Sequence, residues 1–185
     1  MSDALVIIDM QAGSFGPDSP ARYDADGLVE RLNGLAHWVR ARQGLVVWVL
    51  HDGSASDDLA PGTDGWQVLP ALEQHPNDAK IRKTACDGFL GTGLEALLRE
   101  RDPSRVIVTG WATDFCVDTT VRASTGKGFE TWAPSDGHTT SDRPHLSAPQ
   151  IIEHHNYVWS ELIAPGGPVT VASCQAMMLG WTENR

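Results

Sequence analysis

The chain has 185 residues, of which 24 are acidic and 14 basic, giving a formal net charge of −10. Acidic residues are spread along both halves, and Lys and Arg form no cluster. Binding a nucleic-acid backbone or an anionic membrane surface requires clustered basic residues, so neither partner is expected. Hydrophobic residues make up 41% and charged residues 21%, as in ordinary globular proteins. At this length we expect a single domain over residues 1–185.

Short apolar runs that predict buried strands alternate along the chain with longer stretches of helical periodicity. In chain order, the expected elements are a strand at residues 5–8, a helix at 25–42, a strand at 45–50, a helix from Leu94, a strand at 105–109, a helix at 114–126, a strand at 129–132, a helix at 147–162 and a strand at 169–171. Two stretches are predicted to be loops: residues 52–65, rich in Asp, Gly, Ser and Pro, and residues 81–89, which mix polar and apolar side chains.

This alternation predicts a three-layer α/β/α sandwich with a five- to six-stranded, mainly parallel sheet. Ligands of such sheets bind beyond the carboxyl ends of the strands. The residues that follow predicted strands are therefore the first candidates for a site: Asp9, His51 with Asp52, residues 110–116 and residues 133–138.

Cys116 stands at the start of a predicted helix, directly after a predicted strand. One interpretation is packing, because free Cys is among the most buried residue types. The other is a nucleophile, because the positive end of a helix lowers a thiol pKa and favours the reactive thiolate.

Asp9 and Lys83 also have two interpretations each. Asp9 closes the first strand and is either a turn carboxylate or a base able to take a proton from a thiol. Lys83 is one of three lysines in the chain. It is either a surface residue or a cation that stabilises a thiolate and a tetrahedral intermediate.

Four stretches, taken in order, resemble a known family. They are Asp9-x-Gln11, Lys83 ahead of Asp87-Gly88-Phe89-x-Gly91-Thr92, Gly110-x-Ala112-Thr113-x-x-Cys116-Val117, and Asp136-Gly137-His138-Thr139. From about residue 4 to 175 the chain resembles the isochorismatase-like cysteine hydrolases, which are related to nicotinamidases and N-carbamoylsarcosine amidohydrolases.

The resemblance implies a catalytic triad of Asp9, Lys83 and Cys116. It also implies a cis peptide between Trp111 and Ala112, which turns the Ala112 amide toward that of Cys116 to form an oxyanion hole. The implied reaction is cofactor-free hydrolysis of a small-molecule C–N bond, of an amide or ureide, through a thioester. The family commonly forms dimers or tetramers, so a homodimer or homotetramer is expected.

Five residues near predicted strand ends or in the long loops are candidate substrate contacts: Phe15, His51, Trp66, Trp111 and His138. His154 and His155 are adjacent on a predicted helix and point about 100° apart, so they do not easily share a metal. They are either a capping or interface pair, or one of them reaches an active site in an oligomer.

The apolar run at residues 5–8 follows no basic segment, and no run approaches the ~18 apolar residues of a membrane helix. Neither a secretory signal nor a membrane span is therefore expected. The three cysteines, Cys86, Cys116 and Cys174, are odd in number and widely spaced. This pattern is typical of free thiols in a reducing cytoplasm.

Several alternatives are weaker. The nicotinamidase branch carries an Asp-x-His metal motif with further His residues; here the order is His51-Asp52, and the next His is His75. A defined site needs three or four ligands, so no metal is expected. The isochorismate-cleaving branch, a vinyl-ether hydrolase, does not depend on a cysteine, so Cys116 favours C–N hydrolysis.

Four further classes are disfavoured. The Cys116-x5-Arg122 spacing of cysteine phosphatases lacks the glycines that wrap a phosphate, and Asp118 would repel it. The dinucleotide fingerprint G-x-G-x-x-G is absent after the first strand. A non-catalytic small-molecule binding protein has no use for all three triad residues. A thiol-redox role is disfavoured because no second cysteine lies close to Cys116 in the sequence.

Overall fold

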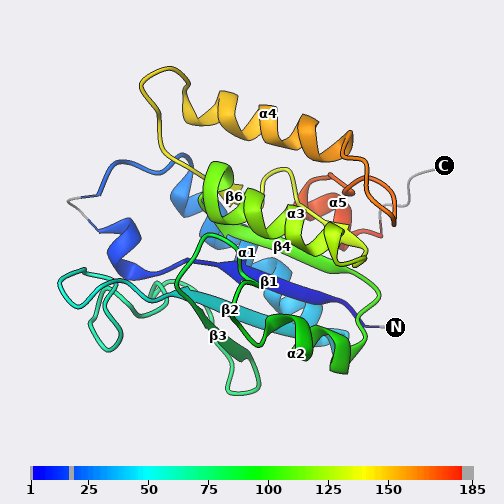
Figure 1. The fold of residues 1–185 in the computed structure, drawn as a ribbon, viewed down its shortest axis with the longest axis horizontal. Coiled ribbons are helices and arrows are strands. Elements are labelled where there is room, and N and C mark those ends of the chain that lie inside the picture. Colours follow the sequence, from blue (N-terminus) through cyan, green and yellow to red (C-terminus); the bar gives the residue numbers. More distant parts are fainter. Residues whose placement is uncertain (1, 17–18, 181–185) are drawn as a thin grey trace.

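The computed structural model describes residues 2–16 and 19–180, and these build a parallel sheet with helices on both faces (Figure 1). The ends of the predicted 1–185 domain, residue 1 and residues 181–185, lie outside this part of the chain. The six strands are β1 (Ala4–Ile8), β2 (Leu45–His51), β3 (Ala79–Lys83), β4 (Val106–Trp111), β5 (Thr131–Trp132) and β6 (His138–Thr139). Their order is β3-β2-β1-β4-β5, with β6 also paired to β4, and every pairing is parallel. The predicted fold class is confirmed.

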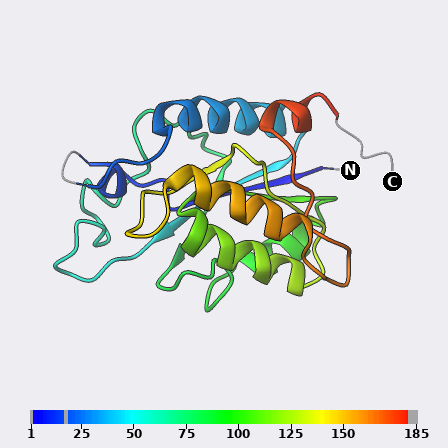
Figure 2. The same cartoon turned by 90° about the horizontal axis from the view of Figure 1, so that it is seen from above.

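Five helices cover the sheet: α1 (Ala25–Ala41), α2 (Leu94–Arg101), α3 (Asp118–Gly126), α4 (Ala148–Ser160) and α5 (Cys174–Met178). Figure 2 shows α1 and α5 on one face, and α3 with α4 on the other. A 3-10 turn at Ala12–Phe15 follows β1, and a π-helical turn at Thr113–Val117 precedes α3. None of the helices in residues 2–16 and 19–180 is both long enough and apolar enough to span a membrane.

The central strand β1 is buried on both faces, as expected for a parallel sheet. Ala4, Val6 and Ile8 belong to the hydrophobic cluster shared with α2 and α3, whereas Leu5 and Ile7 belong to the cluster shared with α1. This alternation follows from the two-residue period of a strand. The whole sheet is thereby fixed between two apolar layers, and only its ends remain for a site.

The predicted strands at 5–8, 45–50 and 105–109 and the helices at 25–42, from Leu94 and at 147–162 all match observed elements within a few residues. The segment 114–126 divides into the π-helical turn and α3. The segment 129–132 contributes only the two residues of β5. The predicted strand at 169–171 was wrong in extent, because Thr170 makes an isolated parallel bridge to Trp132.

The prediction of a loop at 81–89 was wrong at its start, because residues 81–83 belong to the edge strand β3. Its side chains alternate, with Lys80 and Arg82 exposed and Lys83 buried. An edge strand with one solvated face has this mixed composition, which is difficult to distinguish from a loop. Strand β3 ends at Lys83, so this residue lies at the carboxyl ends of the strands, as Asp9 does.

A close backbone approach at Gly110 gives a test of the fold. Gly110 has φ +113°, and a Cβ built there would overlap the Ile8 carbonyl oxygen and lie 2.7 Å from the Ile8 nitrogen. Gly110→Ala should therefore lower the free energy of unfolding by at least about 3 kcal/mol, measured by urea denaturation. The control is Gly34→Ala within α1, where the nearest atom to a new Cβ is Met178 Cε at 4.0 Å. This control should stabilise the protein by roughly 0.5–1 kcal/mol. Equal effects of the two substitutions would contradict a steric requirement for glycine at position 110.

Candidate active site

Three parallel strands of one sheet, β1, β3 and β4, bring the predicted triad together at their carboxyl ends. Asp9 follows β1, Lys83 ends β3, and Cys116 lies in the π-helical turn after β4. His51 ends β2, between the first two in the sheet. Ligand sites of open α/β sheets lie at this edge.

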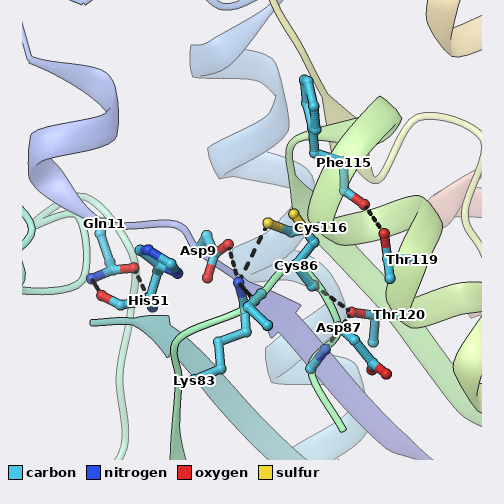
Figure 3. Close-up of polar contacts among 12 residues, drawn as sticks. Asp9, Gln11, His51, Lys83, Cys86, Asp87, Phe115, Cys116, Thr119 and Thr120 are labelled. Carbon is cyan, nitrogen blue, oxygen red and sulfur yellow. Dashed lines mark hydrogen bonds and ion pairs between the residues drawn. The ribbon is translucent and has the colours of Figure 1, made fainter. Parts of the chain in front are cut away.

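The Lys83 ammonium is the centre of the arrangement (Figure 3). Its Nζ lies 2.7 Å from Asp9 Oδ2, 2.9 Å from the Ala85 carbonyl oxygen and 3.4 Å from Cys116 Sγ. An ammonium has three N–H donors, and each of these acceptors uses one. The side chains of Lys83 and Asp9 are 0% and 2% exposed. The structure therefore joins the three residues through one buried cation.

Asp9 leaves the strand geometry at the point where its side chain is needed. Its φ is +49°, a left-handed conformation that Asp adopts more readily than most residues. Its amide still donates to the Val49 carbonyl at 2.8 Å, so the backbone stays attached to β2. Oδ1, the carboxylate oxygen that does not contact Lys83, is buried and has no hydrogen-bond partner among the described residues. That oxygen is available to accept a proton.

Burial raises the pKa of the Asp9 carboxyl above its usual range, although the Lys83 ammonium opposes the shift. Burial also acts to lower the pKa of Lys83, but the charges of Asp9 and Cys116 outweigh it and raise that pKa overall. Lys83 therefore remains charged at neutral pH, and Asp9 is a stronger base than an exposed carboxylate.

The structure overturns the expected effect of the helix start on Cys116. Burial, followed by the neighbouring Asp9 carboxylate, raises the pKa of the Cys116 thiol well above its ordinary value, whereas Lys83 acts in the opposite direction. Cys116 also lies in the π-helical turn, ahead of the first residue of α3. The resting side chain is thus a thiol beside a base, and not a preformed thiolate.

The turn that carries Cys116 has two unusual backbone features. The Trp111–Ala112 peptide is cis. The Ala112 carbonyl accepts hydrogen bonds from Phe115 N at 3.0 Å and from Val117 N at 3.1 Å, which winds the chain into the π-helical turn. Such turns are frequent at functional sites.

A cavity of about 270 Å³ opens at the triad. Five of its lining residues were singled out by the sequence: Asp9, His51, Trp111, Ala112 and Cys116. Phe115 lies in the candidate segment 110–116 without having been named, and three others were not predicted: Asp57, Leu59 and Cys86. Leu59 and Asp57 come from the long loop after β2, whose Asp- and Gly-rich composition does not indicate which of its residues face the cavity.

A larger hollow of about 490 Å³ lies beside the amino end of β2, away from the triad. Two charged residues that line this hollow, Arg40 and Asp78, form an ion pair with each other.

The remaining candidate substrate contacts do not line this cavity. Phe15 packs edge-on against Trp111, with ring centroids 6.3 Å apart. Trp66 donates from Nε1 to Asp52 Oδ1 at 2.9 Å and so anchors the base of the long loop. His138 is 3% exposed. Direct substrate contact by Phe15, Trp66 and His138 therefore stays a prediction.

His138 instead supports the turn that carries Cys116. Its Nδ1 lies 2.9 Å from Thr113 Oγ1, and its Nε2 lies 3.0 Å from Asn156 Oδ1. Asn156 donates from Nδ2 to the Ser135 carbonyl, so its Oδ1 is the acceptor for a proton on Nε2 of His138. His138 is then the neutral Nε2–H tautomer, and Nδ1 accepts from Thr113. The sequence identified this residue but not its role.

Gln11 is a functional residue that the sequence showed only as part of a motif. It is fully buried. Its Nε2 donates to the carbonyls of His51 and Trp66, both at 3.0 Å, and its Oε1 accepts from the His51 amide at 2.7 Å. One side chain thus fixes the end of β2 and the far end of the long loop relative to β1.

The position of Arg122 bears on the phosphatase alternative. Arg122 donates to the Asp118 carboxylate at 2.8 Å on α3 and does not face Cys116 across a phosphate-binding loop. Within residues 2–16 and 19–180, no group of three or more His, Cys, Asp or Glu side chains is arranged to hold a metal.

The rings of His154 and His155 contact each other edge-on, with their centroids 5.5 Å apart. Both residues line a separate hollow beside Phe115.

The family follows from a direct comparison. A model of the isochorismatase domain matches residues 3–172. The chain belongs to the isochorismatase family. The sheet described above is therefore the fold of a family of hydrolases, in agreement with the resemblance found in the sequence.

Relatives have similar sequences and folds. A crystal structure of an isochorismatase family protein superposes with a TM-score of 0.83 at 32% identity, covering 92% of this chain and 98% of that one. A streptothricin hydrolase of Streptomyces noursei is 34% identical over 150 residues, 81% of this chain but 53% of that protein. A ureidoacrylate amidohydrolase, RutB of Caulobacter segnis, is 28% identical over 95 residues, 51% of this chain and 37% of that protein. The chain thus matches only about half the length of the streptothricin hydrolase.

The buried His138 predicts an acid-sensitive stability. Burial lowers its pKa to about 4, against 6.5 for an ordinary histidine. Between these values the unfolded chain binds a proton that the folded chain does not, so stability falls as the pH decreases from about 6.5 toward 4. Between pH 7 and pH 5 this amounts to about 2 kcal/mol. His138→Gln should therefore lose about 2 kcal/mol less than the wild type over that interval in urea denaturation.

The matched control is His37→Gln on the exposed side of α1, which should keep the wild-type pH dependence. If His138→Gln and the wild type lost the same stability between pH 7 and pH 5, the neutral state assigned to His138 would be incorrect.

Proposed function

We propose that the protein is a cysteine-dependent hydrolase that cleaves a C–N bond in a small amide or ureide through a thioester on Cys116. The observation that carries the proposal is the Lys83 ammonium, which contacts both Asp9 Oδ2 and Cys116 Sγ. A vinyl-ether hydrolase that does not depend on a cysteine leaves the contact to sulfur without a role. The relative named as a streptothricin hydrolase supports hydrolysis, and the relative named as a ureidoacrylate amidohydrolase supports cleavage of an amide C–N bond.

In the proposed first step, Asp9 accepts the Cys116 proton while Sγ attacks the substrate carbonyl carbon. The raised pKa of Asp9 suits it to this transfer, because the thiol pKa is raised as well. We assign the oxygen of the tetrahedral intermediate to the backbone amides of Ala112 and Cys116, two residues that line the cavity. Lys83 stabilises the sulfur anion as the proton leaves.

In the second step, protonated Asp9 gives its proton to the leaving nitrogen, and the C–N bond breaks to release ammonia or an amine. Asp9 then takes a proton from water, whose oxygen attacks the thioester carbon. The C–S bond breaks, and the carboxylic acid leaves with the thiol restored. Water and amide are consumed and acid and amine are produced, with no cofactor.

The charges of the residues that line the cavity indicate which substrate charge the site accepts. Among the described residues that line it, none is Lys or Arg. Asp9 is paired with Lys83, and the second lining carboxylate, Asp57, accepts a hydrogen bond from the uncharged Leu59 amide at 2.9 Å. A substrate carboxylate placed there would meet a negative charge, whereas an ammonium would be attracted. We therefore propose neutral or cationic amides as substrates.

The direct test is an ammonia- and amine-release assay over neutral, cationic and anionic amides and ureides. Cys116→Ala should lower turnover by at least ~10³-fold on any substrate that is cleaved, because the nucleophile is removed. Its thermal denaturation should match that of the wild type, which excludes misfolding. The control is Cys174→Ala, a buried thiol on α5 outside the cavity, which should retain turnover. Retained turnover in Cys116→Ala would contradict the mechanism.

The role of Lys83 is tested by the pH dependence of thiol alkylation. Because its charge lowers the pKa of the Cys116 thiol, Lys83→Met should move the midpoint of iodoacetamide labelling at Cys116 to higher pH. Labelling is followed by peptide mass spectrometry, which separates Cys116 from Cys86. The matched control is Lys80→Met, on the exposed side of β3. An unchanged labelling midpoint in Lys83→Met would contradict the proposal that the Lys83 charge lowers the pKa of the Cys116 thiol.

The expected homodimer or homotetramer and the cytoplasmic location remain proposals. Large apolar side chains are exposed near α4, with Phe115 53% and Tyr157 67% exposed, which supports a partner on that side. Light scattering of the purified protein tests the oligomeric state.

A further inference from the structure

A second cysteine lies at the cavity although it is distant from Cys116 in the sequence. Cys86 is exposed and lines the same 270 Å³ cavity as Cys116. Figure 3 draws both side chains at the triad, Cys116 on the turn before α3 and Cys86 on the loop after β3. The mechanism proposed above assigns no step to Cys86, so its position requires a separate explanation.

The loop that carries Cys86 is held in place from two sides. On one side, the carbonyl of its neighbour Ala85 accepts a hydrogen bond from the same Lys83 Nζ that contacts Cys116 Sγ. On the other side, Thr120 of α3 accepts at Oγ1 from the Gly88 amide at 3.0 Å and lies 3.5 Å from the Cys86 carbonyl oxygen. Thr120 is one helical turn after Cys116. Both anchors therefore tie the Cys86 loop to groups adjacent to the nucleophile.

The electrostatics agree with this proximity, because negative charge on Cys86 raises the pKa of Cys116. The third cysteine, Cys174, differs from Cys86 in exposure and in position. Cys174 is 1% exposed, belongs to the core cluster of α1 and lies on α5. Only Cys86 is thus placed to react with Cys116 among the three cysteines of the chain.

We propose that Cys86 and Cys116 form a reversible disulfide that switches the hydrolase off under oxidation by peroxide. Hydrogen peroxide oxidises one thiol to a sulfenic acid, with the second peroxide oxygen leaving as water. The other sulfur then attacks the sulfenic sulfur; the S–S bond forms, and the displaced hydroxide leaves as water with the proton of the attacking thiol. Two thiols are oxidised and one peroxide is reduced to two waters. A dithiol reductant reverses the reaction by exchange.

The disulfide has two effects at the site. It removes the nucleophile of the proposed mechanism, and it joins two residues that line the cavity. It also protects Cys116, because a sulfenic acid with no partner thiol is oxidised further to the sulfinic acid, which dithiols do not reduce. The loss of activity rests on the proposed function, whereas the disulfide itself does not.

The experiment treats reduced full-length protein with a small excess of hydrogen peroxide and measures the disulfide separately from activity. The wild type should lose two of its three titratable thiols and about 2 Da in intact mass, and digestion without reductant should yield a linked Cys86–Cys116 peptide. Dithiothreitol should restore the thiols, the mass and the hydrolase activity. A linkage through Cys174 or between chains, or three intact thiols, would overturn the proposal.

Two variants sharpen the result. Cys86→Ser should form no linked peptide, and the activity that peroxide removes from it should not return with dithiothreitol. Cys174→Ala should still form the Cys86–Cys116 linkage. Each variant is compared with its own untreated sample. If no substrate is found, the mass, thiol and peptide measurements still decide the disulfide, so failure of the proposed function is distinguishable from failure of the switch.

Discussion

The buried ion pair between Lys83 and Asp9 is the constraint on which the site depends. Neither side chain is more than 2% exposed, and Nζ lies 2.7 Å from Oδ2. Two charges removed from water are tolerated only when each is paired and hydrogen-bonded, and loss of one partner costs roughly 3–5 kcal/mol. The pair therefore fixes the end of β3 against the end of β1, and the third N–H of the ammonium then has only the sulfur of Cys116 to meet.

The same pair places a positive charge inside a protein that is negatively charged overall. The chain carries a net charge of −10, yet a positive charge is held at the point where a sulfur anion has to form. Buried charges interact more strongly than exposed ones because the surrounding medium is less polarisable. The internal lysine thereby lowers the pKa of the Cys116 thiol, against the opposite effects of burial and of the Asp9 carboxylate.

Much of the site was predictable from the sequence because the central strands are apolar and end in polar residues. The run before Asp9 and the strand before Cys116 gave both their element type and their place at the sheet edge. The edge strand β3 was missed because its composition follows its solvated face. The position of Cys86 was missed for a different reason: proximity created by a loop fold has no local pattern, and the anchors at Ala85 and Thr120 appear only in three dimensions.

The hydrogen-bonded series from Thr113 through His138 to Asn156 links the turn of the nucleophile to α4, the outer helix. Each link has one donor and one acceptor, so no member can be exchanged for a residue of different hydrogen-bonding character without disturbing the others. Helices on the outside of a fold usually vary freely in sequence. In this protein the inner side of α4 is restrained by the geometry required at Cys116, so the chemistry of the site limits change in a helix that does not line the cavity.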